Sequence, residues 1–315
     1  MRVLDPVKIS YKNLIAAKWR SFLTMLGIII GVASVIIVMA IGASAQALIL
    51  NEVQSIGSNL IGVLPGASDE KGPPASVFGV VVTTLKYSDL QALIKNKNVP
   101  NVVAGSGYVT GSATVSYEEN SFASNFQGVS SDLPNVEKVT LESGRFFSKE
   151  EETNLARVAV LGNNRASGLF PNIDPVGKII TLKNLNFTVI GVMEKKGSSA
   201  FSNPDDTIFV PLLTGQKLLL GINYLNFIRV KIDSEDNLDR AVVNVKSTLR
   251  EQHRINDPAN DDFSVRNAAQ ALSILTNITN ILKYFLTAIA AISLVVGGVG
   301  IMNIMLIAVN QRIRE

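Results

Sequence analysis

Cysteine is absent from this chain of 315 residues, and histidine occurs only once, at position 253. The lack of cysteine excludes a disulfide framework and thiol chemistry. A single histidine excludes zinc sites of the H-E-x-x-H kind and makes a Ser-His-Asp triad possible only through His253. His253 stands at the end of a predicted helix, where we expect it to be exposed. No phosphate-binding loop of the form G-x-x-x-x-G-K-[ST] occurs, so the chain alone is not expected to bind ATP.

Carboxylates occur in short runs, among them 150–152, 205–206 and 261–262. Adjacent acids on loops are usually solvated, and none of these runs has the set of oxygen ligands that calcium needs. We therefore predict no catalytic residue, no metal site and no cofactor. The expected role is that of a binder or transducer and not that of an enzyme.

Charge is missing from two long stretches near the ends of the chain. Residues 284–311 are 28 residues without a charge, and 21–51 form a second such stretch. About 20 apolar residues are enough for a helix to cross a bilayer. We predict transmembrane helices at 21–45 and 284–309. The alternative for the first is a cleaved signal peptide, because Ala43-Ser44-Ala45 resembles a cleavage site, but its apolar core exceeds the usual length of about 7–15 residues.

Basic residues are concentrated beside these stretches. Residues 1–20 carry five of them, whereas the middle of the chain, 46–281, has 21 basic and 24 acidic side chains. This distribution argues against a nucleic-acid partner. Because basic residues mark the cytoplasmic side of a membrane, both ends should face the cytoplasm and the middle should lie outside. The leading segment, 1–20, is either amphipathic, with its lysines facing anionic lipid, or a plain topology signal. Its candidate lipid-facing residues are Lys8, Lys12, Lys18 and Arg20.

Small residues recur within both predicted spans. Gly27 and Gly31 form a G-x-x-x-G in the first, and Gly297, Gly298 and Gly300 cluster in the second. Small residues allow helices to approach closely in lipid, so these positions are candidates for helix packing. The signal is weak, because glycine is common in membrane helices.

The middle of the chain alternates short β-rich runs with helical patterns. Residues 226–232 read as a strand, 234–253 as a helix capped by Ser234, and 262–265 as a further strand, which together predict a β-α-β unit. Residues 178–182 and 187–193 predict a hairpin, and Ser88 is the predicted cap of a short helix. We expect an α+β extracytoplasmic domain over 46–267, a stalk helix over 268–283 that continues into the second span, and a cytoplasmic segment over 310–315.

Several segments match a family in the same order along the chain. They are Asn13–Gly42, Gly144-Arg145-Phe146-Phe147, 158–162 (VAVLG), 174–178 (DPVGK), 187–192 (FTVIGV) and Leu294–Met305. The chain resembles the permeases of the MacB/FtsX type from ABC systems, with a MacB-like periplasmic core domain. The resemblance implies a protein of the cytoplasmic (inner) membrane, a separate ATPase subunit, a second permease copy that forms a dimer, and an extracytoplasmic adaptor. It places Arg312, Arg314 and Glu315 at the approach to the ATPase.

The resemblance also sets limits on what to expect. Family permeases have four spans, and this chain ends where the segment before the third begins, which predicts a fragment or half of a split permease. One hypothesis is a permease subunit whose outer domain moves when the partner hydrolyses ATP, for export of a substrate. The alternative is a signalling or scaffold protein that regulates an extracytoplasmic partner such as a cell-wall hydrolase.

Overall fold

The computed structural model describes residues 22, 26, 29–34, 36–44, 47, 59–67, 81–95, 97–197 and 203–313. The chain forms two compact units. One is Leu48–Ile274, and the other combines Met1–Ala47 with Leu275–Glu315. The predicted segment 1–20 lies outside the described residues.

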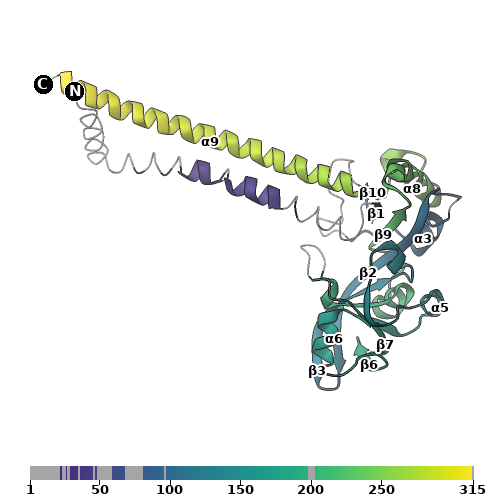
Figure 1. The fold of residues 1–315 in the computed structure, drawn as a ribbon. Helices are drawn as coiled ribbons and strands as arrows, with labels where there is room; N and C mark the ends of the chain where they lie inside the picture. The colour runs from purple at the N-terminus through teal and green to yellow at the C-terminus, as the bar shows by residue number, and fades with distance from the viewer. Residues whose placement is uncertain are drawn as a thin grey trace. The chain divides into compact units, whose positions relative to one another are not determined.

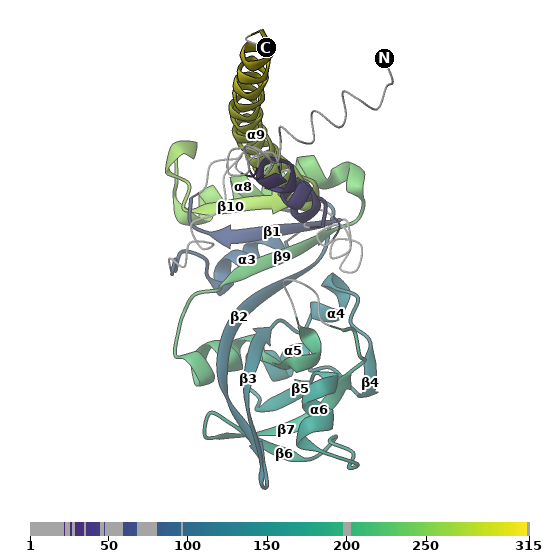
Figure 2. The ribbon, with the colours of Figure 1, turned by 90° about the vertical axis from the view of Figure 1, so that its left-hand side faces the viewer.

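A single sheet of ten strands organises the unit Leu48–Ile274. Its strands follow the order β10-β1-β9-β2-β3-β8-β5-β7-β4, and β6 pairs with β2 and β7. The longest strand, β2 (Val102–Tyr117), pairs with β9 and with β3 and joins two lobes of the unit (Figure 2). Buried side chains fill both lobes, and the cluster of the first lobe also includes Leu212 of the second.

The first lobe holds the β-α-β unit expected from the sequence. Its elements are β1 (Leu60–Pro65), α3 (Tyr87–Leu93), β9 (Phe227–Ile232), α8 (Leu238–His253) and β10 (Phe263–Asn267). Strands β9 and β10 both pair antiparallel with β1, which lies between them, so they are parallel to each other. Helix α8 buries Ala241, Val242, Val245 and Leu249, and α3 buries Leu90 and Leu93, against one face of these strands. The spacing of these apolar residues is the reason for the helices.

The second lobe contains the remaining strands with short helices. They are β3 (Asn120–Val129), α4 (Leu133–Val136), β4 (Leu141–Gly144), α5 (Lys149–Thr153), β5 (Val158–Leu161), α6 (Asn163–Leu169), β6 (Ile179–Leu182), β7 (Leu185–Met193), β8 (Thr207–Pro211), α7 (Leu212–Thr214) and the π-helix η3 (Gly215–Leu220). Two further clusters of buried side chains fill this lobe, one with Phe126 and Phe187 and the other with Phe147 and Phe209. The predicted hairpin is confirmed as β6 and β7. Its loop is two residues long, because Lys183 and Asn184 adopt positive φ angles of 49° and 64°.

Two of the predicted helix caps are wrong. The side chain of Ser88 does not cap α3; the carboxylate of Asp89 accepts from the amide of Lys86 at 2.7 Å instead. Ser234 precedes a 3-10 turn (Glu235–Asn237), and its side chain makes no capping bond. The cap at Ser148 is present, because its hydroxyl accepts from the amide of Glu151 at 3.3 Å while the Glu151 carboxylate accepts from the amide of Ser148.

Helix α9 (Ala268–Ile313) is 46 residues long and follows β10 directly (Figure 1). Its start is fixed by a reciprocal cap: Asn267 Oδ1 accepts from the amide of Gln270 at 2.8 Å, and Gln270 Oε1 accepts from the amide of Asn267 at 3.2 Å. One helix covers both the range expected as a stalk and the uncharged stretch that begins at Tyr284.

The mixed α+β class expected of the middle of the chain is confirmed. The two transmembrane helices of the predicted fold are not confirmed. Within the described residues, no helix qualifies as long and apolar enough to span a bilayer. The transmembrane helices expected at 21–45 and 284–309 therefore stay predictions.

Candidate functional site

Most of the residues that the sequence singled out lie outside the described part of the chain. These are Lys8, Lys12, Lys18, Arg20, Gly27, Arg314 and Glu315. Gly31 lies in a helix and is buried, and the hydroxyl of Ser34 donates to its carbonyl at 2.9 Å. Gly297, Gly298, Gly300 and Arg312 all belong to α9.

Gly298 has no close neighbour in the described part of the chain. A Cβ atom built on it would meet nothing within 4 Å. Gly42, which the sequence reading did not single out, is the position of close approach. A Cβ there would lie 2.3 Å from Cγ2 of Thr279 in α9. Gly42 lies 11 residues after Gly31, which is three helical turns along one face. This spacing could have identified Gly42 from the sequence as a packing position.

His253 contradicts the expectation of an exposed helix end. Its side chain is 9% exposed and lies between two aspartates, with Nδ1 at 2.6 Å from Asp262 and Nε2 at 3.1 Å from Asp89. The hydrogen bond to Asp89 outweighs the opposing effect of burial and, with the help of Asp262, raises the pKa of His253 to about 9. The ring is therefore charged near neutral pH and ties α8 to α3 and to the start of β10. Its two nitrogens face different carboxylates, so the arrangement is not a catalytic triad.

The expectation that the acidic runs are solvated is also wrong for three of their members. Glu152 is fully buried and Asp205 is 2% exposed. Asp205 accepts from the amides of Lys196 and Gly197, each at 2.9 Å, and so holds these two residues beside it. Asp261 forms a two-bond ion pair with Arg250, at 2.8 Å and 2.7 Å. These carboxylates hold backbone or side-chain donors in place and are structural.

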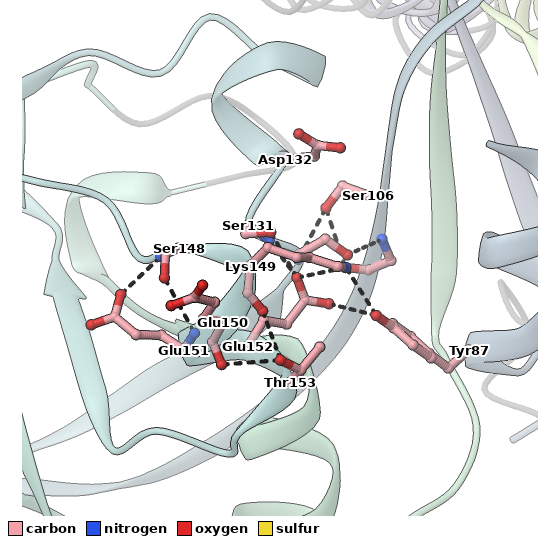
Figure 3. A network of polar contacts seen from close by, with 12 residues as sticks. Tyr87, Ser106, Ser131, Asp132, Ser148, Lys149, Glu150, Glu151, Glu152 and Thr153 are labelled. Atoms are coloured by element: carbon pink, nitrogen blue, oxygen red, sulfur yellow. Dashed lines mark hydrogen bonds and ion pairs between the residues drawn. The ribbon is translucent and has the colours of Figure 1, made fainter. Parts of the chain in front are cut away.

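Glu152 is the centre of a polar group that we call the Glu152 cluster: Tyr87, Ser131, Lys149 and Glu152 (Figure 3). The amide and the hydroxyl of Ser131 both donate to Glu152 Oε2 at 2.9 Å. Lys149 Nζ lies 3.2 Å from the same oxygen, and the hydroxyl of Tyr87 donates to Oε1 at 3.1 Å. Burial raises the pKa of Tyr87, so its hydroxyl keeps the proton that it donates.

A second polar group lies where α4 approaches β9. Glu137 accepts from the hydroxyl of Tyr108 and forms an ion pair with Arg229. The guanidinium lies 5.4 Å from the ring centre of Tyr108 and 5.3 Å from that of Phe227, and the two rings stack at 4.2 Å. Stacking and cation–π contacts of this kind favour a fixed arrangement of the three side chains.

The short segments that carry the family resemblance have a role in backbone packing. They contribute no reactive side chains. In 144–147, a Cβ on Gly144 would lie 2.3 Å from the carbonyl oxygen of Ile190, so only glycine fits. Arg145 pairs with Glu151 through two bonds of 2.8 Å and 2.7 Å, and this hydrogen bonding lowers the pKa of Glu151 to about 2. In the next segment, a Cβ on Gly162 would lie 2.2 Å from the carbonyl oxygen of Pro204.

Nothing in the described residues points to catalysis. No group of three or more acidic or histidine side chains among them is placed to hold a metal ion. A shallow, open hollow lies at the end of η3, lined by Lys217, Gly221, Ile222, Asn223 and Tyr224. Its walls carry no set of converging polar groups of the kind that fixes a small molecule.

Comparison with known proteins decides the family. Residues 21–248 match the MacB-like periplasmic core domain. The chain belongs to this family. The second lobe, the predicted first span and most of the first lobe fall within the matched region, whereas the end of α8 and β10 lie beyond it. The recognition of a MacB/FtsX-type permease domain from the sequence is thereby confirmed.

Curated relatives extend the likeness to almost the whole chain. The macrolide export ATP-binding/permease protein MacB of Marinobacter nauticus is 37% identical over 312 residues, which cover 99% of this chain and 46% of the relative. The MacB protein of Chlorobaculum tepidum is 38% identical over 315 residues, which cover 100% of this chain and 48% of the relative. The chain thus spans about half the length of the curated relatives that it matches.

Solved structures agree with the fold. The periplasmic region of MacB from Actinobacillus actinomycetemcomitans matches with a TM-score of 0.60 at 22% identity, over 73% of this chain and 98% of that one. The extracellular domain of the ABC-type transporter YknZ from Gram-positive bacteria matches with a TM-score of 0.53 at 23% identity, over 66% of this chain and 100% of that one. At such identities the likeness concerns the fold alone.

Proposed function

We propose that this chain is a permease subunit of an ABC transporter, whose extracytoplasmic domain moves when a separate ATPase subunit hydrolyses ATP, for export of a substrate. The observation that carries the proposal is helix α9. It begins at the reciprocal cap of Asn267 and Gln270, with no loop after β10, and continues through the uncharged stretch to Ile313. In this proposal, α9 carries a displacement at its far end to β10 of the sheet.

The membrane arrangement is part of the proposal. Residues 21–45 and 284–309 cross the cytoplasmic membrane, 46–283 lie outside, and 1–20 and 310–315 lie inside. Support comes from the two uncharged stretches and from the basic residues beside them. A second permease copy, an extracytoplasmic adaptor and lipid at Lys8, Lys12, Lys18 and Arg20 are further proposed partners.

The coupling test uses Arg312 and Arg314, which follow the uncharged stretch. In a complete permease reconstituted with its ATPase, Arg312→Ala with Arg314→Ala should lower the stimulation of ATPase activity by the permease several-fold, because the contact at the end of α9 loses two charges. Arg254→Ala, an exposed residue that follows α8 of the outer domain, is the matched control and should leave the stimulation unchanged.

ATPase activity and transport are measured in the same vesicles, after correct insertion of each variant has been verified. Equal stimulation in the variant and in the control would contradict the proposed contact. ATP hydrolysis that responds to the permease while no substrate moves, together with binding of a cell-wall hydrolase, would favour the signalling alternative.

A further inference from the structure

The chain crosses between the two lobes of the unit Leu48–Ile274 at one line. It leaves the first lobe along β2 and returns through residues 221–226, just before β9. The two crossings are hydrogen-bonded to each other. The amide of Asn226 donates to the carbonyl of Tyr108 at 2.8 Å, and the amide of Thr110 donates to Oδ1 of Asn226 at 2.8 Å. Two adjacent crossings are the geometry of a hinge, since a few backbone angles there change the angle between the lobes.

The Glu152 cluster joins the two lobes away from that line. Tyr87 belongs to α3 and packs against the core of the first lobe, whereas Glu152 and Lys149 belong to α5 and Ser131 follows β3 in the second. Tyr87 contacts both charged groups, because its hydroxyl donates to Glu152 at 3.1 Å and accepts from Lys149 at 3.0 Å. Lys149 Nζ also lies 5.5 Å from the centre of the Tyr87 ring.

Burial makes this contact sensitive to the angle between the lobes. The side chain of Glu152 is 0% exposed, whereas that of Lys149 is 54% exposed. A buried carboxylate is tolerated only while its hydrogen-bond partners are in place. If the lobes separate, Glu152 loses the hydrogen bond from the hydroxyl of Tyr87. The free energy lost with that bond favours the arrangement in which the lobes are together.

We propose that Tyr87 and Glu152 form a latch that holds the two lobes in one relative arrangement, and that the lobes turn about the line of Tyr108–Thr110 and Asn226 when the latch opens. The latch is a property of the outer domain itself and does not depend on the proposed transport function. When the latch is open, the two lobes adopt a second relative arrangement. An adaptor or a substrate that binds this arrangement more tightly would favour it over the latched one.

The absence of cysteine makes the distance between the lobes measurable in the full chain. Val243→Cys in α8 and Ile173→Cys after α6 replace residues that are 64% and 47% exposed, one in each lobe. Spin labels on this pair, read by pulsed electron paramagnetic resonance in detergent, should give one dominant distance, with any second population below about 10%. Glu152→Gln replaces one acceptor oxygen by an NH2 group without changing the size of the side chain and should raise a second, shifted distance several-fold.

Two further variants decide the outcome. Tyr87→Phe removes only the hydroxyl and should raise the second distance as Glu152→Gln does, to a smaller extent. Glu150→Gln is the matched control, because this carboxylate lies in the same helix and is exposed, and it should give the distance distribution of the unaltered chain.

Circular dichroism checks that each variant is folded. A folded Glu152→Gln variant with one unchanged distance overturns the latch, and so does an equal second distance in Glu150→Gln. If Glu152→Gln does not fold, Tyr87→Phe decides alone: a raised second distance supports the latch, and an unchanged distribution overturns it.

Discussion

At the scale of single residues, the buried charges of this domain each have partners from other elements. Glu152, Asp205 and His253 each bind at least one group that lies eight or more residues away in the sequence. A buried charge without its partner costs more than the bond itself contributes. These positions are therefore where a single substitution has the largest effect on the outer domain.

His253 predicts a specific dependence of stability on pH. The pKa of His253 is about 9 in the folded chain, and about 6.5 is usual for an unfolded one. Because the folded value is the higher one, the stabilisation is fully present below about pH 6.5 and is lost as the pH rises through about 9. The free energy of unfolding of the unaltered chain should exceed that of His253→Gln by about 1.5–3 kcal/mol near pH 6.

The measurement is urea unfolding of both chains at pH 6, 7, 8 and 9.5. The difference between the two chains at each pH reports the contribution of His253 and its bonds to Asp89 and Asp262. We expect that difference to shrink steadily between pH 7 and pH 9.5. A difference that is constant over this range would mean that His253 is not charged in the folded domain.

At the scale of elements, the sequence predicts helices and strands that have a regular apolar spacing. It does not predict features that depend on tertiary contacts. The spacing of Val242, Val245 and Leu249 was enough to predict α8. The short elements α6 and η3 were missed. Helix α6 has seven residues, too few to show a repeating pattern, and it is fixed by its contacts. The cap at Ser88 failed because α3 begins one residue earlier, at Tyr87, where the carboxylate of Asp89 accepts from the amide of Lys86.

The candidate site residues were harder to predict, for a physical reason. Glycines in an apolar stretch identify where close packing is possible, but the partner decides which of them is used. The neighbour of Gly42 is Thr279, 237 positions away along the chain, and no local pattern encodes that pairing. The same holds for Tyr87 and Glu152, which are 65 residues apart.

Gly42 and Gly298 give a matched pair of substitutions. Gly42→Ala places a Cβ at 2.3 Å from Cγ2 of Thr279 and should destabilise the packing of the two helices by about 1–3 kcal/mol. Gly298→Ala meets no described atom and should stabilise α9 by about 0.5–1 kcal/mol through helix propensity. Thermal unfolding of the full chain in detergent measures both.

Opposite shifts of the melting temperature are expected from this pair. A loss of stability in Gly298→Ala equal to that in Gly42→Ala would show that Gly298 packs against a surface outside the described residues, such as the proposed second copy.

At the scale of the whole molecule, the family follows from the order of many short segments and not from any one motif. The segments around Gly144 and Gly162 fix backbone close to backbone, which explains why a resemblance in sequence carries the fold. What the outer domain binds depends on its exposed side chains. These do not follow the spacing rules that predict helices and strands from the sequence. The predicted orientation in the membrane rests on charge distribution, and so it requires a test on the intact chain.

Single cysteines provide that test, because the chain has none of its own. Val243→Cys and Ile173→Cys lie on exposed surfaces of the outer domain. Polar residues are not automatically suitable sites, since Asp205 is only 2% exposed. In intact cells, an impermeant maleimide should label both exposed cysteines to near completion. It should leave Lys8→Cys unlabelled until the membrane is permeabilised, because the basic residues of 1–20 hold that segment inside. Labelling of Lys8→Cys in intact cells, with Val243→Cys and Ile173→Cys protected, would reverse the orientation. It would also remove the proposed contact between the end of α9 and a cytoplasmic ATPase, since both ends of the chain would then lie outside.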